Sequence, residues 1–150
     1  MDGFEDLGVW QRSSRLCVEL YRELKDSREW GFRDQITRSA LSVPSNIAEG
    51  YERNSRREYV QFLRIAKGSC GEMRTQLQIG KQAGLIEAAR AEDLIEEATA
   101  IGRMLGAMIG IKEGTHFEVD IWPELSRRAN AMLKIVSNLF VLLFALGYIY

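Results

Sequence analysis

Apolar residues recur at intervals of three and four along four stretches of the chain, which is the spacing of one face of an α-helix. The stretches cover residues 5–26, 30–53, 55–83 and 87–112. The connections between them are short and carry turn residues such as glycine, serine and asparagine. Helices joined by short links pack as antiparallel neighbours. The pattern therefore predicts an all-α, up-down-up-down four-helix bundle that occupies residues 1–114.

Each stretch contains a stripe of apolar or small residues that should face the core. In the first stretch the stripe is expected to run through Leu7, Trp10, Ser14, Cys17, Leu20 or Tyr21, and Leu24. In the second it is expected to run through Phe32, Ile36, Ala40, Val43, Ile47 and Tyr51. This second stripe keeps its phase across Pro44, so we predict one helix bent at the proline rather than two helices.

Two local signals lie in the third stretch. Ser55 is followed by Glu58 at the spacing of a capping box, which predicts that the helix begins there. Gly68 and Gly71 lie in mid-helix, where a glycine costs about 1 kcal/mol relative to alanine. We therefore expect the two glycines to allow close approach of a neighbouring helix.

The character of the chain changes after Gly114. Residues 115–123 have the composition of a linker, and residues 124–150 are predicted to form one further helix, so that 115–150 is a C-terminal extension. The end of that helix is apolar all round, but its apolar run is shorter than the about 20 residues that span a bilayer. We expect it to pack on the bundle or on a neighbouring subunit, and a membrane anchor is the less favoured alternative.

Charge and cysteine content narrow the classes of function. The formal net charge is −1 and the pI is about 5.9, so binding to nucleic acid or to an acidic membrane would need a local basic patch. Cys17 and Cys70 lie at apolar helix positions and are expected to be buried, reduced thiols. The acidic residues 1–6 lack the pattern of a signal peptide, so a cytoplasmic location is expected.

The chain offers few residues for catalysis. His116 is the single histidine, which excludes a histidine-based metal site or catalytic triad built within one chain. Glycine-rich phosphate loops of the known kinds are absent from the sequence. We therefore expect a protein that is not an enzyme and has no cofactor or metal.

A dense polar segment interrupts the second helix. Its side chains recur three or four apart, and the third helix carries a matching set. The predicted polar signature consists of Gln35, Arg38, Ser42, Asn46, Glu49, Ser69, Glu72 and Gln76. One interpretation is a buried polar network that fixes helix register or closes a subunit interface. The other is a ligand or RNA site centred on Arg38 and Asn46.

A second candidate site surrounds the start of the third helix. Arg53, Arg56 and Arg57 lie where free backbone N–H groups also favour a phosphate, and Arg64 follows two turns later. Residues 33–74 have eight basic against five acidic side chains, whereas residues 87–113 have three against six. These four arginines are the predicted nucleic-acid contacts. The alternative is a solvated loop combined with charge matching between subunits.

The second helix also carries a family resemblance. The segment Ser42–Gly50, with sequence SVPSNIAEG, and the QITR of residues 35–38 closely resemble the signature of the bacterial four helix bundle family. That family includes proteins encoded in intervening sequences of 23S rRNA genes. The resemblance spans residues 4–112 and implies a ring-like homopentamer. A related branch, the accessory proteins of diversity-generating retroelements, is strongly basic, and this chain departs from it with its net charge of −1.

Two functional hypotheses follow from these observations. The leading one is a non-enzymatic oligomeric scaffold that binds itself and a protein or nucleic-acid partner. The alternative is an RNA-binding accessory protein that uses an arginine-rich edge repeated around the oligomer.

Overall fold

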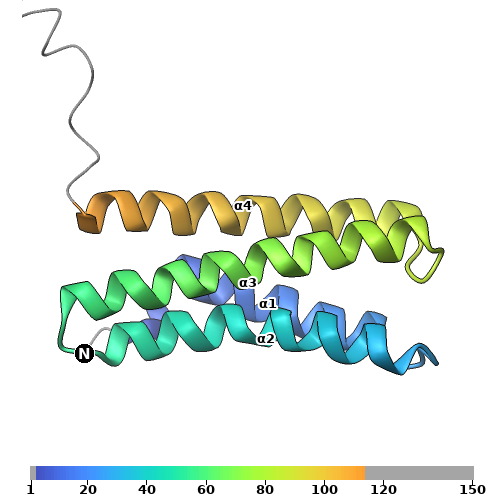
Figure 1. Cartoon of the computed structure of the whole chain (residues 1–150), viewed down its shortest axis with the longest axis horizontal. Coiled ribbons are helices and arrows are strands. Elements are labelled where there is room, and N and C mark those ends of the chain that lie inside the picture. The colour runs from blue at the N-terminus through green and yellow to red at the C-terminus, as the bar shows by residue number, and fades with distance from the viewer. Residues whose placement is uncertain (1–2, 114–150) are drawn as a thin grey trace, which may run out of the picture. The chain divides into compact units, whose positions relative to one another are not determined.

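A computed structural model of the chain describes residues 3–113 (Figure 1). A 3-10 turn, η1, spans Phe4–Asp6. The four α-helices are α1 (Gly8–Glu23), α2 (Trp30–Glu52), α3 (Arg56–Gln82) and α4 (Ala88–Glu113). Successive helices run in opposite directions, so the predicted all-α, up-down-up-down bundle is confirmed. The predicted C-terminal helix and His116 lie outside the described residues.

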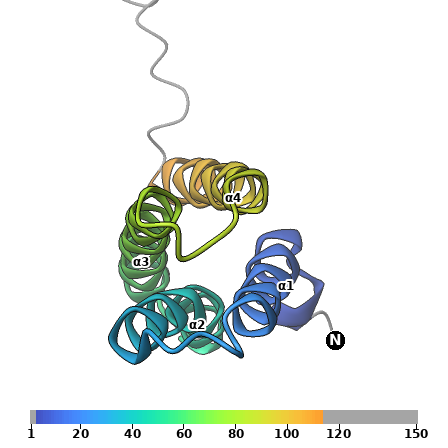
Figure 2. The same ribbon diagram turned by 90° about the vertical axis from the view of Figure 1, so that its right-hand side faces the viewer.

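The four helices surround one apolar core and follow each other around it in chain order, so that α4 lies next to α1 (Figure 2). Every helix contributes large side chains that are less than 2% exposed. They include Leu16, Leu20, Ile36, Ile47, Leu63, Leu77, Leu94 and Ile101. Burial of one such side chain is worth about 1.5–3 kcal/mol. This core fixes the positions of α2, α3 and α4 relative to one another, and therefore the positions of the residues on their outer faces.

The core-facing stripe of α1 agrees with the predicted one in Cys17, Leu20 and Leu24 but differs in its N-terminal half. Its buried residues are Val9, Ser13, Leu16, Cys17 and Leu20, followed by Leu24 after the helix. Leu7 and Trp10 pack at the edge of the core, and Ser14 is only half-buried. The helix also begins at Gly8, later than predicted, because the residues before it form η1. Apolar residues occupy two overlapping helical stripes here, and packing against α2 and α4 selects between them.

The second helix is continuous through Pro44, as predicted. Ile36, Ala40, Val43 and Ile47 are all buried, so the predicted phase of the stripe is correct over most of α2. Tyr51, the last predicted member, is exposed and makes an edge-to-face contact with Tyr59 at a centroid distance of 6.3 Å.

Close helix approach occurs at glycines other than those predicted. A Cβ at Gly50 would lie 2.7 Å from Phe62 Cβ, and one at Gly80 would lie 2.6 Å from Phe32 Cζ. Gly68 and Gly71 have open space around them, because a Cβ at either would meet nothing within 4 Å. The expectation that they allow helix contact is therefore wrong.

Local capping explains where two of the helices begin. The Ser55 hydroxyl accepts a hydrogen bond of 3.4 Å from the backbone N–H of Glu58, which confirms the predicted N-cap of α3. At the start of α4, the Glu87 carboxylate accepts hydrogen bonds from the backbone N–H groups of Ala89 and Arg90. These bonds stabilise the charged carboxylate and lower the pKa of Glu87. Gly84 ends the α3–α4 turn with a φ of 70°, a conformation that favours glycine.

In the part of the chain that the structure describes, no helix is both long enough and apolar enough to cross a membrane.

Candidate functional site

Part of the predicted polar signature joins α2 to α3. The hydroxyls of Ser42 and Ser69 are 2.8 Å apart and share a hydrogen bond. Asn46 Nδ2 donates to the Ser42 backbone carbonyl at 2.7 Å and to the Ser42 hydroxyl at 3.0 Å. All three side chains are half-buried. They form a short polar chain at the outer edge of the α2–α3 contact.

A second polar link lies further along the same contact. Ser39 Oγ donates to Gln76 Oε1 at 2.6 Å, and Gln76 Nε2 donates to Glu72 Oε1 at 3.1 Å. Ser39 is 4% exposed and was not among the predicted residues. Ser39 lies one turn before Ser42, so the sequence places both on the same side of α2. The partner of Ser39 on α3, Gln76, can be identified only in the folded chain.

Four signature residues are not buried within the chain. Gln35 is exposed, and so is Glu72, the partner of Gln76. Arg38 makes an exposed ion pair with Asp34 at 3.0 Å, and Glu49 pairs with Arg53 at 2.5 Å. Arg38 lies two helical turns from Asn46, about 12 Å along the axis, because the rise is 1.5 Å per residue.

Exposed aliphatic side chains flank these polar links. Leu41 on α2 is 49% exposed, and Ile65 and Ile79 on α3 are 43% and 54% exposed. Leu41 precedes Ser42, Ile65 lies one turn before Ser69, and Ile79 follows Gln76 by three residues. We call this surface the α2/α3 face; it comprises Ser39, Leu41, Ser42, Asn46, Ile65, Ser69, Gln76 and Ile79. It combines satisfied polar groups with apolar area open to solvent.

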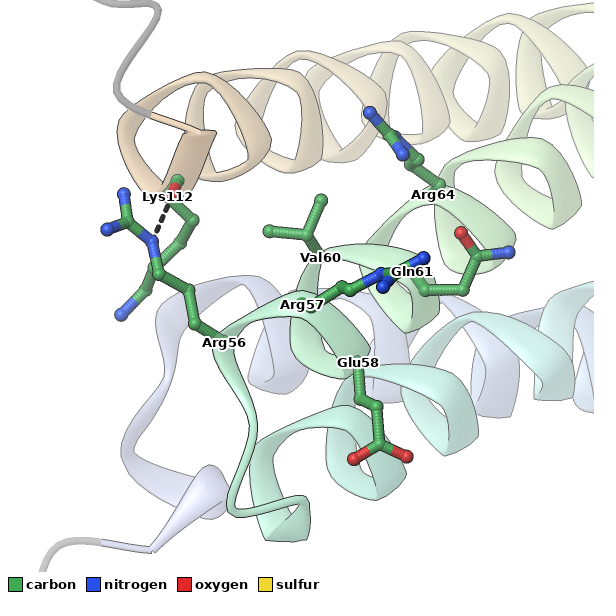
Figure 3. A pocket seen from close by; sticks show the side chains of 7 residues that line it. All are labelled: Arg56, Arg57, Glu58, Val60, Gln61, Arg64 and Lys112. Atoms are coloured by element: carbon green, nitrogen blue, oxygen red, sulfur yellow. Dashed lines mark hydrogen bonds between the residues drawn. The ribbon is translucent and has the colours of Figure 1, made fainter.

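Three of the four predicted arginines meet in one groove of about 690 Å³ between the N-terminal part of α3 and the end of α4. Figure 3 shows Arg56, Arg57 and Arg64 around it, with Lys112 contributed by α4. Arg56 Nε donates to the backbone carbonyl of Lys112, which joins the two helices. Lys112 was not among the predicted residues.

Arg53, the fourth predicted arginine, is placed differently. Its guanidinium pairs with Glu49 and with Glu58, the second at 3.7 Å, and lies 5.2 Å from the centroid of the Phe62 ring. It lines a neighbouring hollow that also includes Arg56 and Lys112. The hydrogen bond that Arg53 donates to Glu49 raises the pKa of Arg53. Its charge is thus largely matched within the chain.

Another groove, of about 400 Å³, lies between the middle parts of α3 and α4. Lys67 and Arg74 line it from α3 and Arg103 lines it from α4. The rest of the lining is mostly small: Gly71, Ala98, Thr99, Gly102 and Gly106, with Cys70. The Cys70 thiol donates to the Ala98 backbone carbonyl, and burial raises the pKa of that thiol. Sequence reasoning missed these three cations because they converge only when α3 packs on α4.

The opposite side of α4 contacts α1 through ion pairs. Arg12 Nε and Nη2 bind the two carboxylate oxygens of Glu97 at 2.7 and 2.6 Å. Arg90 contacts Glu19 at 2.7 Å and Glu23 at 3.3 Å. The hydrogen bond from Arg12 lowers the pKa of Glu97. Part of the acidic edge predicted for residues 87–113 is therefore neutralised by α1.

Comparisons with known proteins agree with this architecture. A structural match is the crystal structure of a protein of unknown function from the S23 ribosomal protein family of Bacteroides thetaiotaomicron, with a TM-score of 0.64 and 26% sequence identity. The match covers 67% of this chain and 97% of that one. The curated proteins contain no match. The family profile described as 23S rRNA-intervening sequence protein matches residues 5–107, and the chain therefore belongs to the 23S rRNA-intervening sequence protein family.

Proposed function

We propose that the protein is a non-enzymatic, self-associating scaffold and that the α2/α3 face is the contact between its copies. The observation that carries the proposal is the combination of exposed Leu41, Ile65 and Ile79 with half-buried, hydrogen-bonded Ser42, Asn46 and Ser69. Single exposed aliphatics are ordinary on protein surfaces. Three beside a satisfied polar cluster have the anatomy of an interface, because apolar contact supplies affinity and polar groups fix orientation.

The family resemblance implies that the copies form a ring of five. A ring requires a head-to-tail contact, in which the α2/α3 face meets a different surface of the next copy. The exposed Trp30, which stacks with the Arg33 guanidinium at 4.2 Å, is one apolar group available for that second surface.

Light scattering coupled to size-exclusion chromatography of the full chain tests this proposal. The wild type should elute as a discrete multiple of 17.1 kDa. The double variant Leu41→Glu, Ile65→Glu should elute as a monomer, because it places charges in the contact without touching the core. Val18→Glu is the matched control, since Val18 is similarly exposed but lies on α1. A monomeric wild type, or a double variant that keeps the oligomer mass, would contradict the proposal.

A second candidate function is RNA binding through the arginine-rich edge. It is supported by the groove that Arg56, Arg57 and Arg64 line together. From the sequence alone, these arginines were known only to be close along the chain. Repetition of the edge around an oligomer would convert weak contacts into avidity. Protein purified at low salt should then carry an excess of absorbance at 260 nm that high salt removes. Absorbance typical of protein alone at low salt would count against this candidate.

A further inference from the structure

The groove between the middle parts of α3 and α4 has no role in the functions proposed above. We propose that it extends the arginine-rich edge into one track that binds a nucleic-acid backbone through its phosphates, without reading the bases. The proposal rests on the second candidate function and names the surface and the mode of recognition. We call this surface the α3/α4 track; its cations are Arg56, Arg57, Arg64, Lys67, Arg74, Arg103 and Lys112.

The first argument concerns charge that is not neutralised. Lys67, Arg74 and Arg103 form no ion pair with a carboxylate among residues 3–112. By contrast, Arg12, Arg53 and Arg90 each bind one or two carboxylates. The α4 segment of residues 98–112, which borders the track, contains no Asp or Glu. The linings of the two neighbouring grooves contain seven Lys or Arg side chains and one carboxylate, Glu58, in a chain of net charge −1. Lys67, Arg74 and Arg103 supply the part of this charge that lacks a carboxylate partner among residues 3–112.

The second argument concerns length and continuity. Arg57 and Arg64 are two helical turns apart, as are Lys67 and Arg74, so both pairs keep their places along the side of α3 that borders α4. From Arg57 to Arg74 the track extends about 26 Å at 1.5 Å per residue. One strand of double-stranded DNA advances 3.4 Å per nucleotide, and at that spacing the track matches about seven phosphates. This length favours an extended polyanion over a compact phosphorylated ligand.

The third argument concerns what the middle groove lacks. The residues that line it include no aromatic side chain, so it offers no platform on which a base could stack. Gly71, Gly102 and Gly106 leave its floor low, and a Cβ at Gly106 would lie 3.5 Å from Lys67 Nζ. A phosphate can therefore approach the cations closely. Recognition by charge alone predicts steep salt dependence and little preference for sequence.

Fluorescence anisotropy with labelled 20-nucleotide RNA tests the proposal on the full chain. The probes are oligouridine, oligoadenine and an RNA duplex, each titrated between 50 and 200 mM KCl. The track variant is Lys67→Gln, Arg74→Gln, Arg103→Gln. The matched control is Arg22→Gln, Lys25→Gln, Arg28→Gln, which removes the same charge from exposed positions at the far end of α1 and its loop. The edge variant is Arg56→Gln, Arg57→Gln, Arg64→Gln.

The wild type should lose about 10³-fold in affinity across this salt range if seven phosphates are contacted. The track variant should bind single strands about 100-fold more weakly at 0.1 M salt, because three lost contacts lower the salt slope by about 2. The control should stay within threefold of the wild type, and the two oligonucleotide sequences should bind alike. Comparison of the single strand with the duplex then identifies which form of the backbone the track takes.

Three results would overturn the inference in different ways. Loss of binding in the edge variant together with full binding in the track variant would confine the RNA site to Arg56, Arg57 and Arg64, and the second candidate function would stand. Absence of wild-type binding at 50 mM KCl would remove both that function and the track. A strong preference for one oligonucleotide would refute recognition through phosphates alone. Thermal melting of each variant verifies that lost binding is not lost folding.

Discussion

The two flanks of α4 use charge in opposite ways. On the α1 side, Arg12 and Arg90 each meet carboxylates of the facing helix, and Arg12 forms a two-pronged contact with Glu97. On the α3 side, Lys67, Arg74 and Arg103 border a groove of small residues without a carboxylate partner among residues 3–112. We call the α1 side, formed by Arg12, Glu19, Glu23, Arg90 and Glu97, the α1/α4 seam. The seam and the middle groove contain similar cations, but among residues 3–112 only the cations of the seam are paired with carboxylates.

This difference separates charges that hold the fold from charges that remain available. A half-exposed arginine bound by a carboxylate contributes to stability, and its removal should be felt in the melting temperature. A cation without such a partner contributes little to the fold and adds repulsion from its neighbours. Substitutions in the α1/α4 seam should therefore change the free energy of unfolding, and substitutions in the middle groove should change RNA binding.

The largest expected effect comes from the seam. Glu97→Ala should lower the free energy of unfolding by about 1 kcal/mol, because it leaves Arg12 partly buried without its carboxylate, while the pair's one-third exposure limits the loss. Chemical denaturation measures the change, and a double-mutant cycle with Arg12→Ala isolates the pair. Glu96→Ala, at the exposed next position, is the control. Equal losses in the two variants would show that the ion pair contributes nothing.

A gain in the free energy of unfolding is expected from a substitution in the middle groove between α3 and α4. Gly106→Ala should raise the free energy of unfolding by about 0.5–1 kcal/mol, because alanine favours the helix and the new Cβ meets only the flexible end of Lys67. Gly68→Ala, on the open side of α3, should stabilise to a similar degree. Only Gly106→Ala should also weaken RNA binding, since its methyl group raises the floor of the groove. Destabilisation by Gly106→Ala would contradict the room that the structure leaves for a Cβ at Gly106.

Low pH should remove the stabilisation that the Arg12–Glu97 ion pair of the seam provides. The bond from Arg12 lowers the folded-state pKa of Glu97, so its stabilisation is fully present above the unfolded-state pKa of about 4.3 and is lost as pH falls through the folded value. The difference in melting temperature between wild type and Glu97→Gln should therefore be largest near neutral pH and shrink below about pH 4. A difference that stays constant down to pH 3 would exclude a titrating pair.

The smallest effect on stability is expected at Arg103. Arg103→Gln should change the free energy of unfolding by less than about 0.5 kcal/mol, because the side chain is exposed and has no carboxylate partner among residues 3–112. For the Arg103→Gln variant, the slope of log affinity for RNA against log salt concentration should fall in magnitude by about 0.7. A large loss of stability would reveal that Arg103 belongs with the seam residues rather than with the track.

Sequence patterns predicted the second helix better than the first. In α2 the residues Ile36, Ala40, Val43 and Ile47 leave one choice of apolar stripe, and all four are buried. In α1 both Leu7–Trp10–Cys17 and Val9–Leu16–Leu20 have helical spacing, so the sequence permits two faces. Contact with α2 and α4 buries Val9, Leu16 and Leu20 together with Cys17, and leaves Leu7 and Trp10 at the edge. Where two stripes compete, the facing helices decide.

The candidate sites were predictable only in part. The closeness of Arg56 to Arg57, and the hydrogen bonds of Asn46 to Ser42, follow from helical spacing. The matching polar sets of the second and third helices also anticipated the contact of Ser42 with Ser69. Other partners between helices do not follow from spacing. Ser39 binds Gln76, 37 residues away in the sequence, and Arg12 binds Glu97, 85 residues away. The helical repeat does not predict pairs at such separations.

The order of residues along the chain established the class of fold, the number and order of the described helices, and the family, because hydrophobic period, caps and turns act over a few residues and appear directly in the order of side chains. Packing between helices settled which cations are neutralised at the α1/α4 seam and which converge on the α3/α4 track. Electrostatic energy depends on distances between helices, and those distances are set when the core packs.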